Sequence, residues 1–282
     1  MGPPMRMTRR QFRAWENKSI TLVGMSGVGK THLSMHLRKQ DWFHYSADYR
    51  IGTRYLGEPI LDQIKGQAMK VPFLRDLLRS DSVYIASNIT VDNLKPVLGF
   101  LGKLGNPKQG GLDLAEFKRR QVMYRDAEVA AMKDVPEFIR KAHAIYGYRN
   151  FVNDAAGSLC ELGDPEVLRV LAKHTLILYI RATEENVREL RRRAKIDPKP
   201  LLYRGEFLDA ELEAYRRERR LRRVSAIEPD DFVRWVFPRL FASRLPRYEA
   251  IARDHGYTIG SDQLADVTTE REFLSRVECV LD

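Results

Sequence analysis

Short apolar runs of strand length alternate with stretches of helical periodicity along this chain. The apolar runs occupy residues 19–23, 42–48, 150–154, 175–180 and 257–259. The run at 175–180 is apolar at nearly every position, which is typical of a parallel strand buried on both faces. Helical spacing follows at 31–38, where two leucines are four residues apart, and at 269–281. Strands that alternate with helices predict a three-layer α/β fold around a parallel sheet.

The middle of the chain departs from this alternation. Residues 56–148 have a helical pattern that Pro72, Pro96 and Pro136 interrupt. We therefore expect a mostly helical insertion within the α/β core. The expected division is a basic N-terminal tail at 1–17, a core at 18–55 and 149–282, and the insertion at 56–148.

The composition is that of an ordinary folded protein with an excess of positive charge. The 282 residues include 48 Lys and Arg against 38 Asp and Glu, a net charge of +10, and two segments, 1–50 and 181–223, carry the whole excess. Such a balance favours an anionic partner, whether a nucleotide, a nucleic acid or a phosphorylated metabolite. The basic residues at 6–13 and 216–223 keep nucleic acid among these partners. A solvated helix face is the plain interpretation of the second run.

Cysteines and long apolar segments are both scarce. Cys160 and Cys279 lack the paired spacing of a zinc site and indicate reduced thiols. No apolar run reaches the ~18 residues of a membrane span, and the N-terminus lacks the apolar core of a secretory signal. We therefore expect a cytoplasmic protein that makes no membrane contact.

One motif carries specific chemistry. Residues 24–31 match the P-loop pattern G-x-x-x-x-G-K-[ST] in full and lie between a predicted strand and a predicted helix. Glycines let the backbone wrap around phosphates, and the loop N–H groups and the helix N-terminus stabilise the anion. Lys30 is expected to reach the β and γ phosphates of ATP, and the Thr31 hydroxyl to bind Mg²⁺. The predicted nucleotide contacts are Gly24, Ser26, Gly27, Val28, Gly29, Lys30 and Thr31.

A P-loop alone does not separate kinases from ATPases or GTPases, but the chain has neither an NKxD-type guanine signature nor the Asp-Glu pair of motor ATPases. Four further segments, in the right order, resemble the shikimate kinase and nucleoside monophosphate kinase branch of the P-loop kinases. They are Ser46-Ala47-Asp48, Ile177-Leu178-Tyr179-Ile180, Lys199-Pro200-Leu201-Leu202 and Arg244-Leu245-Pro246-Arg247-Tyr248. The resemblance covers residues 18–55, 150–202 and 240–281.

The resemblance implies a role for several of these positions. Asp48 would accept the proton of an acceptor hydroxyl, and Arg244 would bind an anionic group of the acceptor. Arg192 lies where the family has an adenine-stacking arginine, and Lys199 where a lid cation stabilises the transferring phosphate. The plain alternatives are capping or pairing at a strand end for Asp48 and ordinary surface charge for the three cations.

Two more candidates and a lid complete the predicted site. The family's glycine-rich turn is replaced by residues 153–158, where Asp154 could instead hold Mg²⁺ through water. The segment 116–120 is similar to the family's substrate helix with its charges shifted, which makes Lys118 a candidate for acceptor binding. The insertion at 56–148 suggests an acceptor-binding region for a substrate bulkier than shikimate. Residues 190–210 are expected to close as a lid.

Three functions remain open at this point. The leading one is an ATP-dependent kinase that moves the γ-phosphoryl group to a hydroxyl of a polar small molecule. The second is a nucleic-acid kinase acting on a modified base or a strand end, which the two basic segments favour. The third is a regulatory ATPase that has no acceptor. All three use ATP at the same P-loop.

Overall fold

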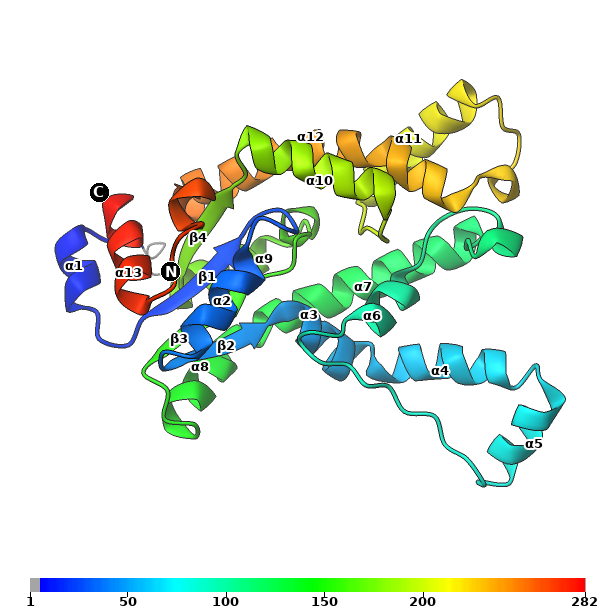
Figure 1. Ribbon diagram of the computed structural model, residues 1–282, viewed down its shortest axis with the longest axis horizontal. Coiled ribbons are helices and arrows are strands. Elements are labelled where there is room, and N and C mark those ends of the chain that lie inside the picture. Colours follow the sequence, from blue (N-terminus) through cyan, green and yellow to red (C-terminus); the bar gives the residue numbers. More distant parts are fainter. Residues whose placement is uncertain (1–5, 282) are drawn as a thin grey trace.

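The computed structural model describes residues 6–281 and is built around a parallel five-stranded sheet (Figure 1). The strand order is β2-β3-β1-β4-β5. The strands are β1 (Ser19–Val23), β2 (Trp42–Ser46), β3 (Asn150–Asp154), β4 (Leu176–Arg181) and β5 (Gly256–Gly260). Each of the five predicted strands is present, with ends displaced by two residues at most. The central position of β1, between β3 and β4, brings the P-loop to the middle of the carboxyl edge of the sheet.

Helices supply the rest of the architecture. They are α1 (Arg9–Ala14), α2 (Lys30–Arg38), α3 (Ala47–Arg50), α4 (Gly57–Ala68), α5 (Pro72–Arg79), α6 (Lys95–Leu101), α7 (Leu114–Lys133), α8 (Val135–Ala144), α9 (Pro165–His174), α10 (Glu184–Ile196), α11 (Gly205–Glu218), α12 (Pro229–His255) and α13 (Glu270–Cys279). Local sequence sets several of their ends. Thr183 and Thr269 form capping boxes at the starts of α10 and α13, where each hydroxyl accepts a backbone N–H of the first turn.

The helices cover both faces of the sheet, which confirms the three-layer prediction. Alternate residues of a strand point to opposite faces. In β2, Trp42 packs edge-on against Phe273 of α13, with ring centroids 5.8 Å apart, while Tyr45 packs against Phe138 of α8 at 5.0 Å. In β4, Tyr179 stacks on Tyr248 of α12 at 5.4 Å. The register of the strands places Tyr179 on the same face as Tyr45, so α8 and α12 share one layer and α13 lies in the other.

The segment from 56 to 148 is mostly helical, apart from a stretch without helix at 81–94 and the connection before α7, and its prolines mark helix starts. Pro72, Pro96 and Pro136 lie in the first turns of α5, α6 and α8, where a missing backbone N–H costs no helical hydrogen bond. Figure 1 shows α4 and α5 extending away from the sheet, whereas α7 and α8 return to it. The last two helices of the segment therefore belong to the core packing.

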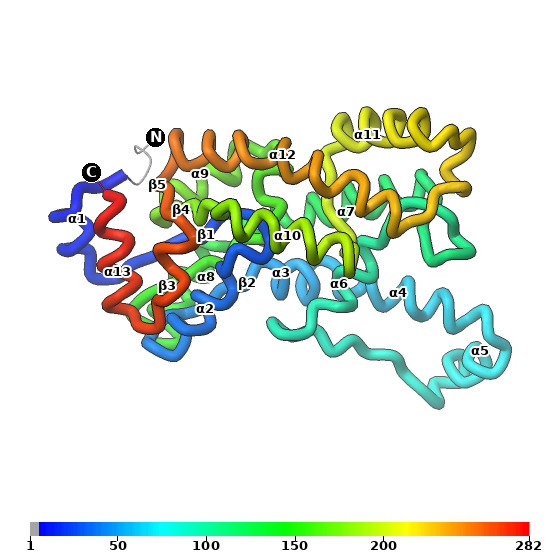
Figure 2. The backbone as a smooth tube through the Cα atoms, turned by 45° about the horizontal axis from the view of Figure 1, so that its top comes forward, coloured from blue at the N-terminus to red at the C-terminus, as the bar shows by residue number. Residues whose placement is uncertain are grey.

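A long helix joins the sheet to a second group of helices. Helix α12 passes through Pro238 and Pro246 and packs against β4, β5, α10 and α11 (Figure 2). Beyond the sheet, Phe232 and Leu240 of α12 form a separate apolar cluster with Tyr203, Tyr215 and their neighbours. Helix α10 and the connection at 197–204 thus lie against α12 and beside the carboxyl edge of the sheet.

The basic N-terminal segment packs against the C-terminal end of the chain. Arg9 donates to the carbonyl of Leu281 at 3.3 Å, and Arg13 forms an ion pair with Glu278 of α13. The first five residues of the predicted tail lie outside the described residues. Across residues 6–281, no helix combines the length and the apolar character needed to cross a bilayer.

Candidate active site

The P-loop has the backbone that its glycines predict. Gly24, Gly27 and Gly29 have φ values of 144°, 87° and 100°, a region that residues with a Cβ rarely adopt. A Cβ at Gly24 would also lie 2.7 Å from the carbonyl oxygen of Ile180 in β4. Gly29 is the N-cap of α2, and within the described chain no side chain caps that helix. The N–H groups of the first turn therefore face the loop, ready for an anion.

Lys30 points back into the loop. Its side chain is buried, and its Nζ donates to the carbonyls of Gly24 at 2.8 Å and Met25 at 3.0 Å. Burial lowers the pKa of this ammonium group, while the nearby Asp154 and Asp48 oppose the shift. The charge of Lys30 is thus held at the centre of the loop among carboxylates.

Thr31 and Asp154, predicted as metal ligands, lie in contact. Asp154 is the last residue of β3, and its Oδ2 accepts a hydrogen bond from Thr31 Oγ1 at 2.6 Å. His44 Nε2 approaches the same carboxylate oxygen at 3.7 Å. A hydroxyl and a carboxylate at the edge of a phosphate-binding loop are oxygen donors of the kind that Mg²⁺ prefers. The residues present therefore fit Mg²⁺ bound together with a nucleotide.

Asp48 stands next to the P-loop on the first turn of α3. Tyr124 of α7 donates its hydroxyl hydrogen to Asp48 Oδ1 at 3.2 Å. Burial, reinforced by the charge of Asp154, raises the pKa of Asp48 to about 6, although Lys30 and Tyr124 act in the opposite direction. A carboxylate that titrates close to neutral pH can hold and release a proton under ordinary conditions.

A second carboxyl group, that of Glu128, is buried close to Asp48 and was not predicted from the sequence. Glu128 is fully buried on α7, one helical turn after Tyr124, and accepts a hydrogen bond from Ser158 at 2.6 Å. Burial raises its pKa to about 8 despite that bond. Its Oε1 has no hydrogen-bond partner among the described residues. The four-residue spacing of 124 and 128 was the only sequence signal that both side chains share a helix face.

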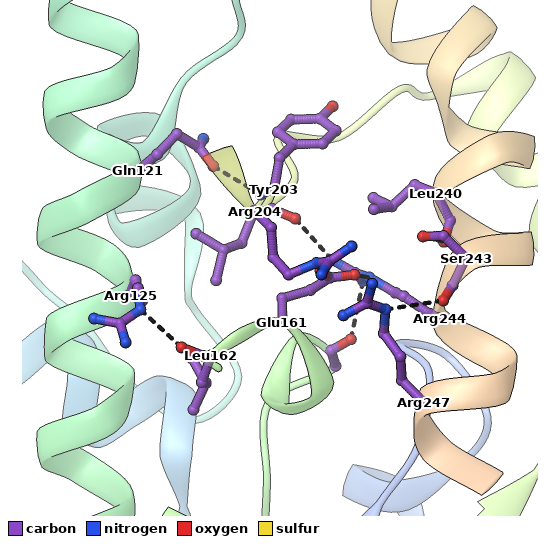
Figure 3. A network of polar contacts seen from close by, with 12 residues as sticks. Gln121, Arg125, Glu161, Leu162, Tyr203, Arg204, Leu240, Ser243, Arg244 and Arg247 are labelled. Carbon is purple, nitrogen blue, oxygen red and sulfur yellow. Dashed lines mark hydrogen bonds and ion pairs between the residues drawn. The ribbon is translucent and has the colours of Figure 1, made fainter. Parts of the chain in front are cut away.

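Arg244 lies at the site, but the structure gives it protein partners. The side chain is buried on α12, and its guanidinium donates to Glu161 at 3.0 Å, to the Gly157 carbonyl at 3.0 Å and to the Leu202 carbonyl at 2.8 Å. Figure 3 shows Glu161 between Arg244 and Arg204, and Arg204 donates to its other oxygen at 3.0 Å. Arg244 thereby joins the Gly157 turn to the connection between α10 and α11.

The other three predicted cations, Lys199, Arg192 and Lys118, each form an ion pair within the protein. Lys199 lines the same hollow as Asp48 and forms a 3.5 Å ion pair with Asp197. Arg192 is exposed on α10 and pairs with Glu189 at 2.7 Å, and its adenine contact stays a prediction. Lys118 pairs with Asp209 at 2.6 Å in a separate cavity of about 470 Å³, so its role in acceptor binding also stays a prediction.

Two adjoining hollows meet at Asp48. One, of about 240 Å³, is lined by P-loop residues, Thr31 and Asp154. The other, of about 270 Å³, is lined by Tyr124, Lys199, Arg244 and a set of aliphatic side chains. Asp48 and the P-loop residue Ser26 border both hollows. One hollow therefore suits the phosphates of a nucleotide, and the other suits a second molecule that reaches Asp48.

The basic run at 216–223 lies at the far end of α11 (Figure 2). Part of its charge is met within the protein, since Arg217 pairs with Glu213 at 2.9 Å and Arg219 with Asp231 at 3.2 Å. Nucleic-acid binding by this segment stays a prediction.

In the described part of the chain, no group of three or more His, Cys, Asp or Glu side chains is arranged to hold a metal ion.

Comparison with known proteins gives distant structural likenesses alone. No family model matches the sequence, and no curated protein matches it. Among solved structures, the chain is similar to shikimate kinase from Bacteroides thetaiotaomicron at 15% sequence identity and a TM-score of 0.42, over 93% of this chain and 95% of that one. Independently of that likeness, the parallel sheet and the Gly24–Thr31 loop establish the predicted α/β fold of the P-loop type.

Proposed function

We propose that this protein is an ATP-dependent phosphotransferase that moves the γ-phosphoryl group of ATP to a hydroxyl of a polar small molecule. The observation that carries the proposal is the position of Asp48, whose carboxylate borders both the P-loop hollow and the second hollow. An acceptor hydroxyl in the second hollow would meet the terminal phosphate beside a carboxylate able to take its proton. An ATPase without an acceptor has no need of a second hollow at this place.

The P-loop side of the site would bind the nucleotide. Lys30 and the loop N–H groups would neutralise the phosphates, and Thr31 with Asp154 would hold Mg²⁺, directly or through water. Bound Mg²⁺ supplies charge neutralisation on the phosphate oxygens. Arg192 is a candidate for the adenine side, on the assumption that its bond to Glu189 opens when the nucleotide binds.

The acceptor side would activate the hydroxyl. Asp48 would orient the acceptor and accept its proton, and Tyr124 would fix the carboxylate through its hydrogen bond. Lys199, at the edge of the same hollow, would offset negative charge that develops on the transferring group. Arg244 would hold the wall of the hollow and present positive charge to the acceptor.

The test is transfer of labelled γ-phosphate to pooled hydroxyl compounds in the presence of Mg²⁺. Lys30→Ala is expected to abolish transfer and to weaken ATP binding, because the loop loses its central charge. Asp48→Asn is expected to abolish transfer while sparing ATP binding, since Asp48 acts on the acceptor. Asp76→Asn changes an exposed aspartate of α5 in the same way and serves as the matched control.

Three results would contradict the proposal in whole or in part. Normal transfer by the Asp48→Asn enzyme would remove the proton-accepting role of that carboxylate. ATP turnover that no acceptor pool alters, in an enzyme that yields only inorganic phosphate, would instead identify an ATPase. Label found in a nucleic acid instead of a small molecule would show that the acceptor is a nucleic acid.

A further inference from the structure

The hollow that faces Asp48 has two unlike walls. Its polar end consists of Asp48, Ser26 and Ser158, next to the P-loop. The opposite wall is hydrocarbon and comes from two segments, α6 with the residue before it and the connection from α10 to α11. Its aliphatic members are Leu94, Val97, Leu98, Leu101, Leu201 and Leu202.

This hydrocarbon wall is anchored in the core. Val97 and Leu101 of α6 are 1% and 2% exposed. Val97 fits so closely over the turn at Gly52 that a Cβ there would lie 2.4 Å from Val97 Cγ2. Leu94, the residue before α6, and Leu98, four residues later within it, are only partly buried and present their remaining surface to the hollow. The wall is therefore a fixed apolar surface, and a ligand has to be complementary to it.

A hydroxyl group placed against such a wall leaves water and gains no partner. The resulting loss is a factor of about 10 or more in affinity for each hydroxyl, while apolar surface in the same place gains affinity. A polyhydroxylated acceptor could satisfy one hydroxyl at Asp48 but would turn its others toward leucine side chains. The wall therefore favours an acceptor with a single reacting hydroxyl on an apolar body.

The charges around the hollow add one further requirement. Arg244, which lines the hollow, and Arg204, a half-buried residue that lines the neighbouring cavity, share a single carboxylate, Glu161, so the three side chains together keep an excess positive charge. Among residues 6–281, the one ion pair of Lys199 is a long contact of 3.5 Å with Asp197, and both side chains are largely exposed. An acceptor with one anionic group, a carboxylate or a phosphate, would balance this charge.

We infer that the acceptor is an amphiphilic alcohol: one hydroxyl directed at Asp48, an apolar ring or chain against Leu94 and Leu98, and one anionic group near Arg244 and Lys199. This inference rests on the proposed function. In the transfer step the acceptor oxygen bonds to the γ-phosphorus, the bond from that phosphorus to the β,γ-bridging oxygen breaks, ADP leaves with the electron pair, and the hydroxyl proton passes to Asp48. The polarity of the acceptor is thus confined to its two ends.

The experiment compares probes that are matched in size and charge. 3-Hydroxycyclohexane-1-carboxylate and 4-(hydroxymethyl)benzoate carry one hydroxyl, and shikimate and quinate carry several on a similar ring with the same single carboxylate. Binding to the protein saturated with Mg²⁺ and ADP is followed by ligand-observed NMR, and transfer from ATP by phosphorus NMR. The variant is Leu98→Asn, and the control is Leu168→Asn, a partly buried leucine of α9 that lies against the core away from the hollow.

The monohydroxy probes are expected to bind at least about tenfold more tightly than the polyhydroxy probes. Leu98→Asn is expected to remove most of that preference, whereas Leu168→Asn keeps it. Equal or tighter binding of the polyhydroxy probes, or binding of neither set, would overturn the inference. Comparing the two probe sets on the unaltered protein tests the inference even if Leu98→Asn fails to fold. Preferential binding of the monohydroxy probes without transfer would preserve the inferred ligand class and refute the phosphotransferase function. Transfer confined to the polyhydroxy probes would support the phosphotransferase function and refute the inferred ligand class.

Discussion

Glu128 gives the sharpest quantitative prediction, because its environment forces a protonation state that the unfolded chain does not share. Its carboxyl group is fully buried, one of its oxygens lacks a hydrogen-bond partner within the described chain, and its pKa is raised from the ordinary 4.5 to about 8. Between these two values the unfolded state releases a proton that the native state keeps. The free energy of unfolding therefore falls as the pH rises through this window and levels off above it.

The size of the effect follows from the shift. At ~1.4 kcal/mol for each pKa unit, the whole shift corresponds to about 5 kcal/mol, and about 3.5 kcal/mol of it is lost between about pH 5 and about pH 8, because each state is only partly titrated at the ends of this window. Replacing Glu128 by Gln keeps the shape of the side chain and an acceptor for the Ser158 hydroxyl, and it removes the titration. The difference in free energy of unfolding between the variant and the parent protein is therefore expected to change by about 3.5 kcal/mol in favour of the variant from about pH 5 to about pH 8.

The assay is equilibrium urea unfolding of both proteins at the two pH values, and the measured quantity is the difference between the two stability differences. Glu137→Gln is the control. Glu137 is a partly exposed glutamate of α8, and Lys141 lowers the pKa of its carboxyl group, so it stays ionised in both states throughout the window. Parallel pH dependences of the parent protein and Glu128→Gln would refute the reasoning, because they would show that Glu128 titrates alike in the folded and unfolded chain.

Four further outcomes are expected. The rate of phosphoryl transfer should fall on acidification with a pKa of about 6, that of Asp48. Tyr124→Phe should move this limb to higher pH, because the hydrogen bond from Tyr124 lowers the pKa of Asp48 and its loss raises that pKa; an unmoved limb in the rate profile would contradict that role. Gly157→Ala should weaken ATP binding measured by calorimetry, since its Cβ would lie 2.6 Å from a P-loop amide nitrogen. Glu161→Gln should lower the free energy of unfolding by about 3–5 kcal/mol, because it leaves two arginines without their carboxylate. If the 216–223 run binds nucleic acid, retention on heparin should fall steeply with salt, and elution already at low salt would exclude that partner.

The strands and the P-loop could be predicted because their signals are local. A short apolar run bounded by turn residues favours a buried strand. The glycines of 24–31 occupy positions where the loop needs positive φ angles, so their spacing reports the loop conformation directly. Thr31 and Asp154 were each predicted separately as metal ligands; the structure places them in contact, since the carboxyl ends of adjacent parallel strands meet at one edge of the sheet. The roles predicted for Lys118 and Arg192 depend on which side of a charged helix faces the site, and helical spacing does not report this.

The sequence by itself determined the α/β class, the parallel strands and the phosphate-binding loop, because each depends on residues close together along the chain. The resemblance of Ser46-Ala47-Asp48 to a kinase family made Asp48 a candidate. Only the tertiary structure decided what surrounds Asp48: Tyr124 and Glu128 from α7 and the leucine wall from α6. These groups are far apart in sequence and acquire their chemistry from burial, which no local pattern reports. The raised pKa of Glu128 is the clearest case, since the same carboxyl group on an exposed turn of α7 would be an ordinary charged residue.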